Sequence, residues 1–376
     1  EMTPNIEAYS EFGFSKSTSP AVIAPSAAFG NNINQVNCDN PLLTAEQISA
    51  ICGIIDEETG FYTRDIETDN KDIAGDGIVQ AEIRRRFVEG GGRTDTLTLT
   101  NFRFIGGLRG TVMDHIDWDV FGQVAQTDLN RLQTNQVTAV NLGRSLDIVE
   151  DEDGNIVCRS VVNGTDPNCI PFVSAFVVGA EVDPGLAAYV DTPTLTTGSI
   201  EQFVYGASAQ TDLGNYGVAS PWAEDGPNVL VGIEYRRDGI RAQADGTNQA
   251  GGLIGSGGAV LPTEGETDLV EYFAEIQVPL VQGMEFAQEL GVSAAIRSSD
   301  YESIDILNGV QGGEFSVNTY SVGATWSPVD DIRFRAQFQR AIRAPNVFEL
   351  FNPANTNLSS LSDPCSGFAG TSDAPT

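Results

Sequence analysis

Residues 332–339 read Ile332-Arg333-Phe334-Arg335-Ala336-Gln337-Phe338-Gln339. The apolar side chains stand at the even positions of this stretch and the polar side chains at the odd positions. Because successive side chains of a β-strand point to opposite faces, the alternation predicts a strand with one apolar and one polar face. We expect the apolar face to lie against other apolar material and the polar face to meet water or hydrogen-bonding partners.

The same alternation recurs along most of the chain in segments of about ten residues, which is about the length of a tilted strand that crosses a bilayer. It is clear in 271–280, 286–297 and 319–326. Aromatic residues such as Tyr301 and Trp326 recur near segment ends, as in the girdles of outer-membrane barrels. A soluble sandwich also alternates. The aromatic residues and the mixed charged and small residues of the polar faces favour a membrane barrel instead.

The segments predict about nine antiparallel strands, and the connections between them alternate in length. We place the strands at 4–14, 80–109 (broken by the three glycines at 90–92), 114–126, 200–213, 228–238, 267–279, 285–299, 315–327 and 331–343. Short turns fall at 110–113, 214–226, 280–283 and 327–331, and long loops at 15–79, 127–199, 239–266 and 300–314, with another after 344. Short turns on one side and long loops on the other are typical of an outer-membrane barrel.

The composition excludes several other classes of protein. The 376 residues include 20 basic and 52 acidic side chains, which give a net charge of −32. Such a surface repels phosphate backbones, so we expect no nucleic-acid partner. No apolar run reaches the 18 residues that would predict a transmembrane helix.

The five cysteines predict two disulfides. Cys38 and Cys52 are close in sequence, as are Cys158 and Cys169, and each pair lies within one expected loop. This spacing favours local disulfides in an oxidising compartment over a metal site or free thiols. Cys365 is left as a free thiol or as the partner of a cysteine outside residues 1–376.

The first long loop contains a predicted helix. Thr44 followed by Gln47 forms a capping box, and Gly53 is a C-terminal stop, so we expect a helix at 45–52. A disulfide from Cys38 would tie this helix down and stiffen a loop that has little hydrophobic core of its own.

Three parts of the sequence resemble the barrel of TonB-dependent receptors, particularly the large proteobacterial kind. They are 327–351, the pair 85–91 and 104–110, and the pair 155–159 and 167–172. The most specific block is Arg343-Ala344-Pro345-Asn346, which is followed by Glu349-Leu350-Phe351. The resemblance spans almost the whole chain.

The resemblance implies an all-β fold, an antiparallel transmembrane β-barrel in the bacterial outer membrane. Barrels of this kind have about 22 strands and a plugged lumen. We therefore expect residues 1–376 to be one incomplete barrel domain with long outer loops, lacking the plug, the TonB box and the C-terminal strands. Its partners would be outer-membrane lipid, lipopolysaccharide, its own plug and the TonB protein.

The implied function is TonB-energised uptake of a scarce nutrient, either an iron–siderophore or other metal chelate, or an oligosaccharide. A passive porin or adhesin barrel and a secreted all-β binding module remain as alternatives. We expect no enzyme and no cofactor, because the single histidine, His115, lies at a short turn without a nucleophile nearby. We also expect no metal site, since Asp69, Asp72 and Asp76 lack the acidic residue that completes an EF-hand loop.

Five polar residues are candidate substrate contacts: Arg297, Arg333, Arg335, Arg343 and Asn346. Arginines on the polar face of the strands would guide an anionic substrate such as a metal chelate. In the alternative reading they are structural and pair with carboxylates of the plug or of neighbouring strands, for example Glu275 and Glu289. Arg343 and Asn346 would then hold the base of a loop.

Overall fold

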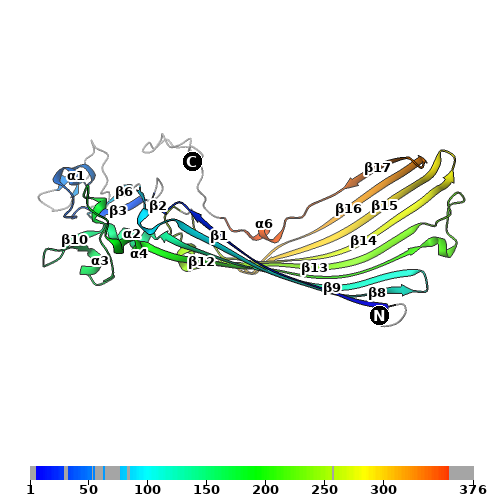
Figure 1. Cartoon of the computed structure of the whole chain (residues 1–376), viewed down its shortest axis with the longest axis horizontal. Coiled ribbons are helices and arrows are strands. Elements are labelled where there is room, and N and C mark those ends of the chain that lie inside the picture. The colour runs from blue at the N-terminus through cyan, green and yellow to red at the C-terminus, as the bar shows by residue number, and fades with distance from the viewer. Residues whose placement is uncertain are drawn as a thin grey trace.

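The computed structural model describes residues 6–28, 33–52, 54–55, 62–63, 77–82, 85–255 and 258–354. Within these residues, nine strands form one antiparallel sheet in the order β1-β8-β9-β12-β13-β14-β15-β16-β17. The strands are β1 Ile6–Ile23, β8 Arg93–Val112, β9 Ile116–Val137, β12 Asp191–Asp212, β13 Asn228–Ala244, β14 Thr263–Met284, β15 Ala287–Asp305, β16 Val310–Val329 and β17 Ile332–Arg340. Figure 1 shows a long, twisted wall. The predicted all-β fold and the antiparallel order of nine strands are confirmed.

Most strands are longer than predicted, and they extend mainly toward the end of the wall with the large loops (Figure 1). β9 continues to Val137, whereas the alternation of apolar residues ends near 126. The extension is held by polar pairs between strands, such as the hydroxyls of Thr94 and Thr134, which lie 2.6 Å apart. A strand that is polar on both faces gives no period-two signal, so the sequence pattern ends before the ladder does.

The first part of the predicted strand at 80–109 is not part of the wall. The described residues of this part form the short strands β6 Ile78–Glu82 and β7 Arg85–Arg86 and the 3-10 helix η1 Val88–Gly90. β6 and β7 pair with the loop strands β3 Ile33–Asn37 and β2 Ala27–Ala28 rather than with β1. The three consecutive glycines at 90–92 separate these loop strands from the wall.

Two connections also differ from prediction. The long loop expected at 300–314 is the four-residue turn 306–309, in which Asn308 donates from its main-chain and side-chain nitrogens to Asp305. Asn308-Gly309 is a strong turn signal because both residues tolerate positive φ. The short turn expected at 280–283 lies at 285–286, and Phe286 stands there with φ of 61° instead of beginning a strand.

The wall has two faces, which we define by neighbouring rows of side chains. The apolar face carries the row Val278, Val292, Ala324 and Ala336, each residue paired with the next across the strands. The polar face carries the adjacent row Gln277, Ser293, Gly323 and Gln337. Side chains of the apolar face remain open: Phe338 is 63 % exposed and Val322 is 50 % exposed. The apolar residues of the wall therefore do not form a core with each other.

Several glycines of the polar face let an aromatic ring lie flat against the neighbouring strand. A Cβ atom added at Gly206 would stand 2.4 Å from the ring of Phe121, and one at Gly232 would stand 2.3 Å from the ring of Phe273. Each glycine pairs directly with its aromatic neighbour. These two positions accept glycine alone while the rings keep their places.

The remaining elements are short and lie mostly in the connections. The helices are α1 Ala45–Ile51, α2 Ala139–Leu146, α3 Arg159–Val162, α4 Pro184–Val190, α5 Gly246–Gln249 and α6 Val347–Phe351, with η2 Val173–Ala175 and η3 Leu213–Tyr216. The other short strands are β4 Ile54–Ile55, β5 Tyr62–Thr63, β10 Ile148–Glu150 and β11 Ile156–Cys158. Among the described residues, none of the helices has the length and apolar character needed to cross a membrane.

Helix α1 begins as predicted. The hydroxyl of Thr44 accepts from the Gln47 main chain at 3.2 Å, and the Gln47 side chain accepts from the Thr44 main chain at 2.8 Å. This reciprocal pair is the expected capping box. Gly53, the predicted stop, lies outside the described residues.

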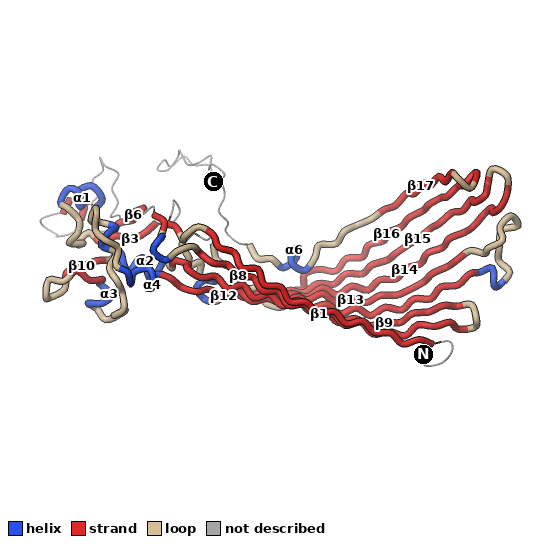
Figure 2. The backbone as a smooth tube through the Cα atoms, viewed as in Figure 1, coloured by secondary structure: helices blue, strands red, loops and turns tan. Residues whose placement is uncertain are grey.

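Three connections on one side of the sheet share a hydrophobic core. We call the described residues of 24–92, 138–190 and 245–262 the loop cap; Figure 2 shows its short elements at one end of the wall. The core consists of Ala28, Phe87, Val137, Leu142, Leu146, Phe172, Leu186, Val190 and Ile254. A second cluster joins Val36, Cys38, Cys52 and Val79. The first loop therefore contributes to a core that it shares with the two other loops, and it also contains the small cluster around its own disulfide.

Candidate functional site

The polar face contains a recess of about 270 Å³ between β14 and the end of β17. Its lining includes Phe273, Glu275, Arg297, Thr319, Ser321 and Gln339. These side chains come from two adjacent rows: Phe273, Arg297 and Thr319 form one, and the other runs from Glu275 to Gln339. The lining also includes Tyr320 and Arg340, so the recess collects one carboxylate, two arginines, an amide and several hydroxyl-bearing residues from four consecutive strands.

Arg297 is held in place by two neighbours. Its Nη1 donates to Glu271 Oε2 at 3.0 Å, and its Cζ lies 5.0 Å from the centre of the Phe273 ring. Glu271 is only 6 % exposed and also accepts from Ser299 Oγ at 2.5 Å. The charge of Arg297 is thus balanced inside the wall, by Glu271 rather than by Glu275. The guanidinium still keeps N–H groups that are free for the recess, since the Arg297 side chain is 44 % exposed.

Two other candidate substrate contacts, Arg333 and Arg335, lie near the short-turn end of the sheet, away from the recess. Arg333 donates from Nη2 to Glu289 at 2.6 Å and from Nε to Ser327 at 3.2 Å. This pair matches the structural reading of the sequence. Arg335 stands opposite Thr325 and forms no ion pair within the described part of the chain. The three arginines share a face but do not form one site, and their contact with a substrate stays a prediction.

Arg343 and Asn346 lie together because both bind Glu349. Arg343 donates twice to the Glu349 carboxylate, at 2.7 and 3.0 Å. Asn346 accepts from the Glu349 main chain at 2.9 Å, and its own N–H donates to the Glu349 side chain at 3.0 Å. The second pair is a capping box that begins helix α6. The spacing Asn346 to Glu349 is a signal from which this helix is predictable.

We call residues 341–354 the strap; they lead from the end of β17 to helix α6, which lies against the middle of the wall (Figure 1). Helix α6 packs against β13 and β14, and Val347 is buried. A Cβ atom at Gly265 would come within 2.5 Å of the Phe351 ring, so the ring rests on the backbone of β14. β17 ends at Arg340 instead of the predicted 343. Pro345 cannot donate to a sheet ladder, which disfavours continuation of the strand.

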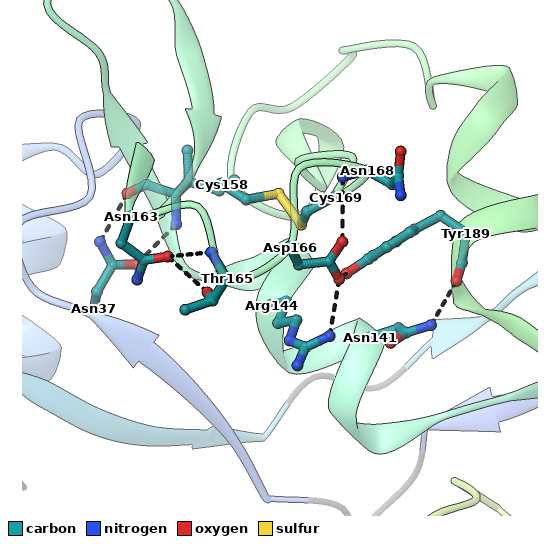
Figure 3. The surroundings of a disulfide bond; sticks show 11 residues. Asn37, Asn141, Arg144, Cys158, Asn163, Thr165, Asp166, Asn168, Cys169 and Tyr189 are labelled. Carbon is teal, nitrogen blue, oxygen red and sulfur yellow. Dashed lines mark hydrogen bonds and ion pairs between the residues drawn. A yellow bond between two sulfur atoms is a disulfide. The ribbon is translucent and has the colours of Figure 1, made fainter. Parts of the chain in front are cut away.

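The loop cap contains two disulfides, the same pairs that the spacing predicts. Cys38 bonds to Cys52, and Cys158 bonds to Cys169 (Figure 3). Cys365 and the aspartates at 69, 72 and 76 lie outside the described residues. Within the described residues, no three side chains of the kinds that bind metals are grouped closely enough to hold an ion.

Asp166 connects three elements beside the second disulfide (Figure 3). It accepts from Arg144 Nη1 and from the Tyr189 hydroxyl, each at 2.8 Å. Burial, and then the bond to Asp166, raise the pKa of Tyr189 to about 12. The hydrogen bond from Tyr189 is the main cause that lowers the pKa of Asp166. The network joins α2, α4 and the loop that follows α3.

Arg159 joins the first and second cap loops. It donates to both oxygens of Asp39, at 2.6 and 2.7 Å, and to Asp147 at 3.0 Å. Burial raises the pKa of Asp39, but hydrogen bonds from Arg159 and Asn37 outweigh it, so the net shift is downward. The Asp39 carboxylate therefore remains charged at neutral pH, and the two ion pairs of Arg159 stabilise the junction.

His115 lies in the turn between β8 and β9, as expected from the sequence. Its main-chain oxygen accepts from the Thr211 hydroxyl at 2.8 Å, and its ring is 6.0 Å from the ring of Tyr216. These contacts describe a turn residue that packs on the neighbouring connection.

A family model described as the TonB dependent receptor-like β-barrel matches residues 174–372, which is more than half of the chain. A comparison with curated proteins gives no significant match. The matched region includes β12 to β17, the recess and the α6 capping box. Members of this family are typically transporters and not enzymes. The chain therefore belongs to the TonB-dependent receptor-like β-barrel family, and this membership implies bacterial outer-membrane transport energised by TonB.

Proposed function

We propose that residues 1–376 form part of one barrel domain in a receptor that takes up a scarce nutrient. Support for including the first 173 residues comes from strand pairing. β9 pairs with β12 over most of its length, and β8 and β1 continue the same sheet outward from β9. The unmatched part of the chain thus contributes three strands to the sheet that contains the matched part.

The observation that carries the proposal is the exposed apolar face. Its rows run across neighbouring strands without interruption, as in Ile276, Ala294, Val322 and Phe338. In water such a large apolar surface is unfavourable, whereas in a bilayer it is the surface that meets lipid. We therefore assign the apolar face to outer-membrane lipid, with lipopolysaccharide at the level of the loop cap.

The polar face then lines the lumen, where a plug domain and the nutrient meet it. Paired charges such as Arg297 with Glu271 and Arg333 with Glu289 give this face fixed donors and acceptors. We propose that the nutrient is a metal chelate or an oligosaccharide. The candidate contacts remain Arg297, Arg333, Arg335, Arg343 and Asn346.

Fractionation and TonB binding test the proposal together. The full-length protein should enter the outer-membrane fraction, show heat-modifiable mobility and bind the purified periplasmic domain of TonB. In planar bilayers it should give no steady conductance. Stable open channels without TonB binding would instead identify a passive porin, and recovery only in the soluble fraction would identify a secreted binding module.

A further inference from the structure

We propose that the connection between β12 and β13, residues 213–227, is part of the surface that contacts lipid. In this assignment Trp222 anchors the connection in the interfacial region of the phospholipid leaflet on the short-turn side. The inference rests on the proposed function, because that function gives the apolar face to lipid. It goes further, since it assigns a membrane contact to a segment that the sequence predicts to be a short turn facing the periplasm.

Trp222 continues a row of the apolar face. It forms a β-bridge with Val281, and Val281 pairs with Leu290. Leu290 pairs in turn with Trp326, and Trp326 with Phe334. Residues that are paired across strands point to the same face of a sheet. Trp222 therefore lies on the apolar face at the level of Trp326, and its side chain is 59 % exposed.

The connection also closes an open strand edge. β14 is longer than β13 at the short-turn end, and the pairing of the two strands stops at Gln277. Beyond that point the Leu280 carbonyl accepts from Ser220 Oγ at 2.6 Å, and the Gln282 N–H donates to the Trp222 carbonyl at 2.8 Å. Unpaired main-chain groups are not tolerated in hydrocarbon. The two bonds make this edge of β14 compatible with lipid where β13 is missing.

Gln282 fixes the position of the connection. Its Oε1 accepts from the main-chain N–H groups of Glu224 at 2.7 Å and Asp225 at 3.0 Å. Its Nε2 donates to Asp225 Oδ2 at 2.8 Å. Both acidic residues are exposed and lie within three residues of Trp222. The connection thus passes from an apolar to a charged surface over a short span, as expected at a membrane boundary.

The indole of Trp222 suits the interface better than the hydrocarbon interior. Among the described residues, the hydrogen bonds of Trp222 involve its main chain only. Trp326 differs, because its Nε1 donates to the Phe286 carbonyl at 2.9 Å. An indole N–H without a protein acceptor needs a polar partner, which the ester carbonyls and phosphates of phospholipids supply.

Spin labelling of the full-length receptor in phosphatidylethanolamine–phosphatidylcholine vesicles tests the assignment. Nitroxides are attached to Trp222→Cys, Glu224→Cys and Ala336→Cys, one per variant, and the signal of the parent protein treated alike is subtracted. Power saturation then compares access of oxygen, which concentrates in lipid, with access of a water-soluble nickel complex. Position 222 should resemble 336, with high oxygen and low nickel access, whereas the matched position 224 should show the reverse.

Equal nickel access at 222 and 224, with 336 protected, would overturn the inference and leave the proposed receptor function intact. Nickel access at 336 would overturn the lipid assignment of the whole face, and the proposed function with it.

A second substitution tests the role of Gln282. Gln282→Leu removes the acceptor of two main-chain N–H groups, so in the Trp222→Cys protein it should raise nickel access at 222 to the level found at 224. Gln277→Leu is the control, because Gln277 lies on the polar face of the same strand, and it should leave this access unchanged. Heat-modifiable mobility shows that each variant has formed its barrel. Equal nickel access in the two variants would overturn the attachment of the connection through Gln282.

Discussion

Asn37 and Ile148 are 111 residues apart in the chain, yet they are joined as two paired strand residues would be. Asn37 Nδ2 donates to the Ile148 carbonyl at 2.7 Å, and the Ile148 N–H donates to Asn37 Oδ1 at 3.2 Å. Both residues are buried. The side-chain amide therefore acts as a peptide group that links the first cap loop to the second.

Replacing Asn37 by leucine should uncouple these loops. The change leaves the N–H and the carbonyl of Ile148 buried without partners, which costs roughly 1–3 kcal/mol. Hydrogen exchange at the Ile148 amide should become faster in Asn37→Leu. The control is Asn168→Leu, at an exposed position of the second loop, which should leave that exchange rate unchanged. Equal protection of Ile148 in both variants would show that the link contributes nothing.

The two faces of β17 should differ in their tolerance of charge. Ala336 lies on the apolar face and Gln337 on the polar face. An arginine facing lipid near the middle of the bilayer costs about 2–4 kcal/mol, whereas the same residue in the lumen is tolerated. Ala336→Arg should therefore lower the outer-membrane yield and abolish heat-modifiable mobility, while Gln337→Arg assembles normally. If Gln337→Arg were the more harmful change, the assignment of the faces would be reversed.

The loop cap should face the outside of the cell and the short turns the periplasm. A cysteine introduced at Ala250, in the third cap loop, should react with an impermeant maleimide on intact cells. A cysteine introduced at Val329, at the end of β16, should react only after the outer membrane is permeabilised. The prediction follows from the side on which the large connections lie. The opposite labelling pattern would contradict it.

A single methyl group at Gly265 should release the strap. The Cβ atom of Gly265→Ala would clash with the Phe351 ring at 2.5 Å, and overpacking of this kind typically costs about 1–3 kcal/mol. Gly239→Ala is the control, since its Cβ atom would meet Glu266 at an ordinary 3.6 Å. Limited proteolysis within 341–354 should increase in the first variant alone. In a Phe351→Ala background, Gly265→Ala should have no further effect on this proteolysis.

Acid should loosen the loop cap. Burial raises the pKa of Asp39, but hydrogen bonds from Arg159 and Asn37 outweigh it and hold the pKa below its ordinary value of 3.8. A depressed pKa stabilises the fold above the ordinary value, and this stabilisation is lost as the pH falls through the folded value. The hydrogen-exchange protection of the cap, corrected for the intrinsic exchange rate at each pH, should therefore fall below about pH 4. Asp39→Asn should flatten this dependence, and an unchanged profile would exclude the carboxylate as a cause.

The features that the sequence predicts correctly are those encoded within a few residues. Alternation around Ala336 reports the faces of a strand, and Thr44 with Gln47 reports a helix start. The strand ends were misplaced because polar extensions such as that of β9 lack the alternation. Asn308-Gly309 was a readable turn signal inside a segment interpreted as a long loop.

The features that the sequence does not predict depend on residues that meet only after folding. Phe87 and Phe172 come from different loops, and their ring centres lie 6.0 Å apart in the shared cap core. The partner of Arg297 was also undetermined. In the register of β14 and β15, Arg297 stands opposite Phe273, so Glu271 and Glu275 are equally distant from it along β14. Ser299 stands opposite Glu271 and donates a hydrogen bond to it, which completes the network of Arg297, Glu271 and Ser299. Strand register alone does not choose between them.

The shared core of the loop cap affects how this receptor can diversify. Barrel loops that do not contact one another can be exchanged one at a time, since the conformation of each depends only on the strand ends that it connects. Here Ile254 of the third connection packs into the same cluster as Ala28 of the first and Phe172 of the second. A transplanted loop would leave a hole or a clash in its two neighbours. Grafting between receptors should thus succeed for all three connections together and fail for any one alone.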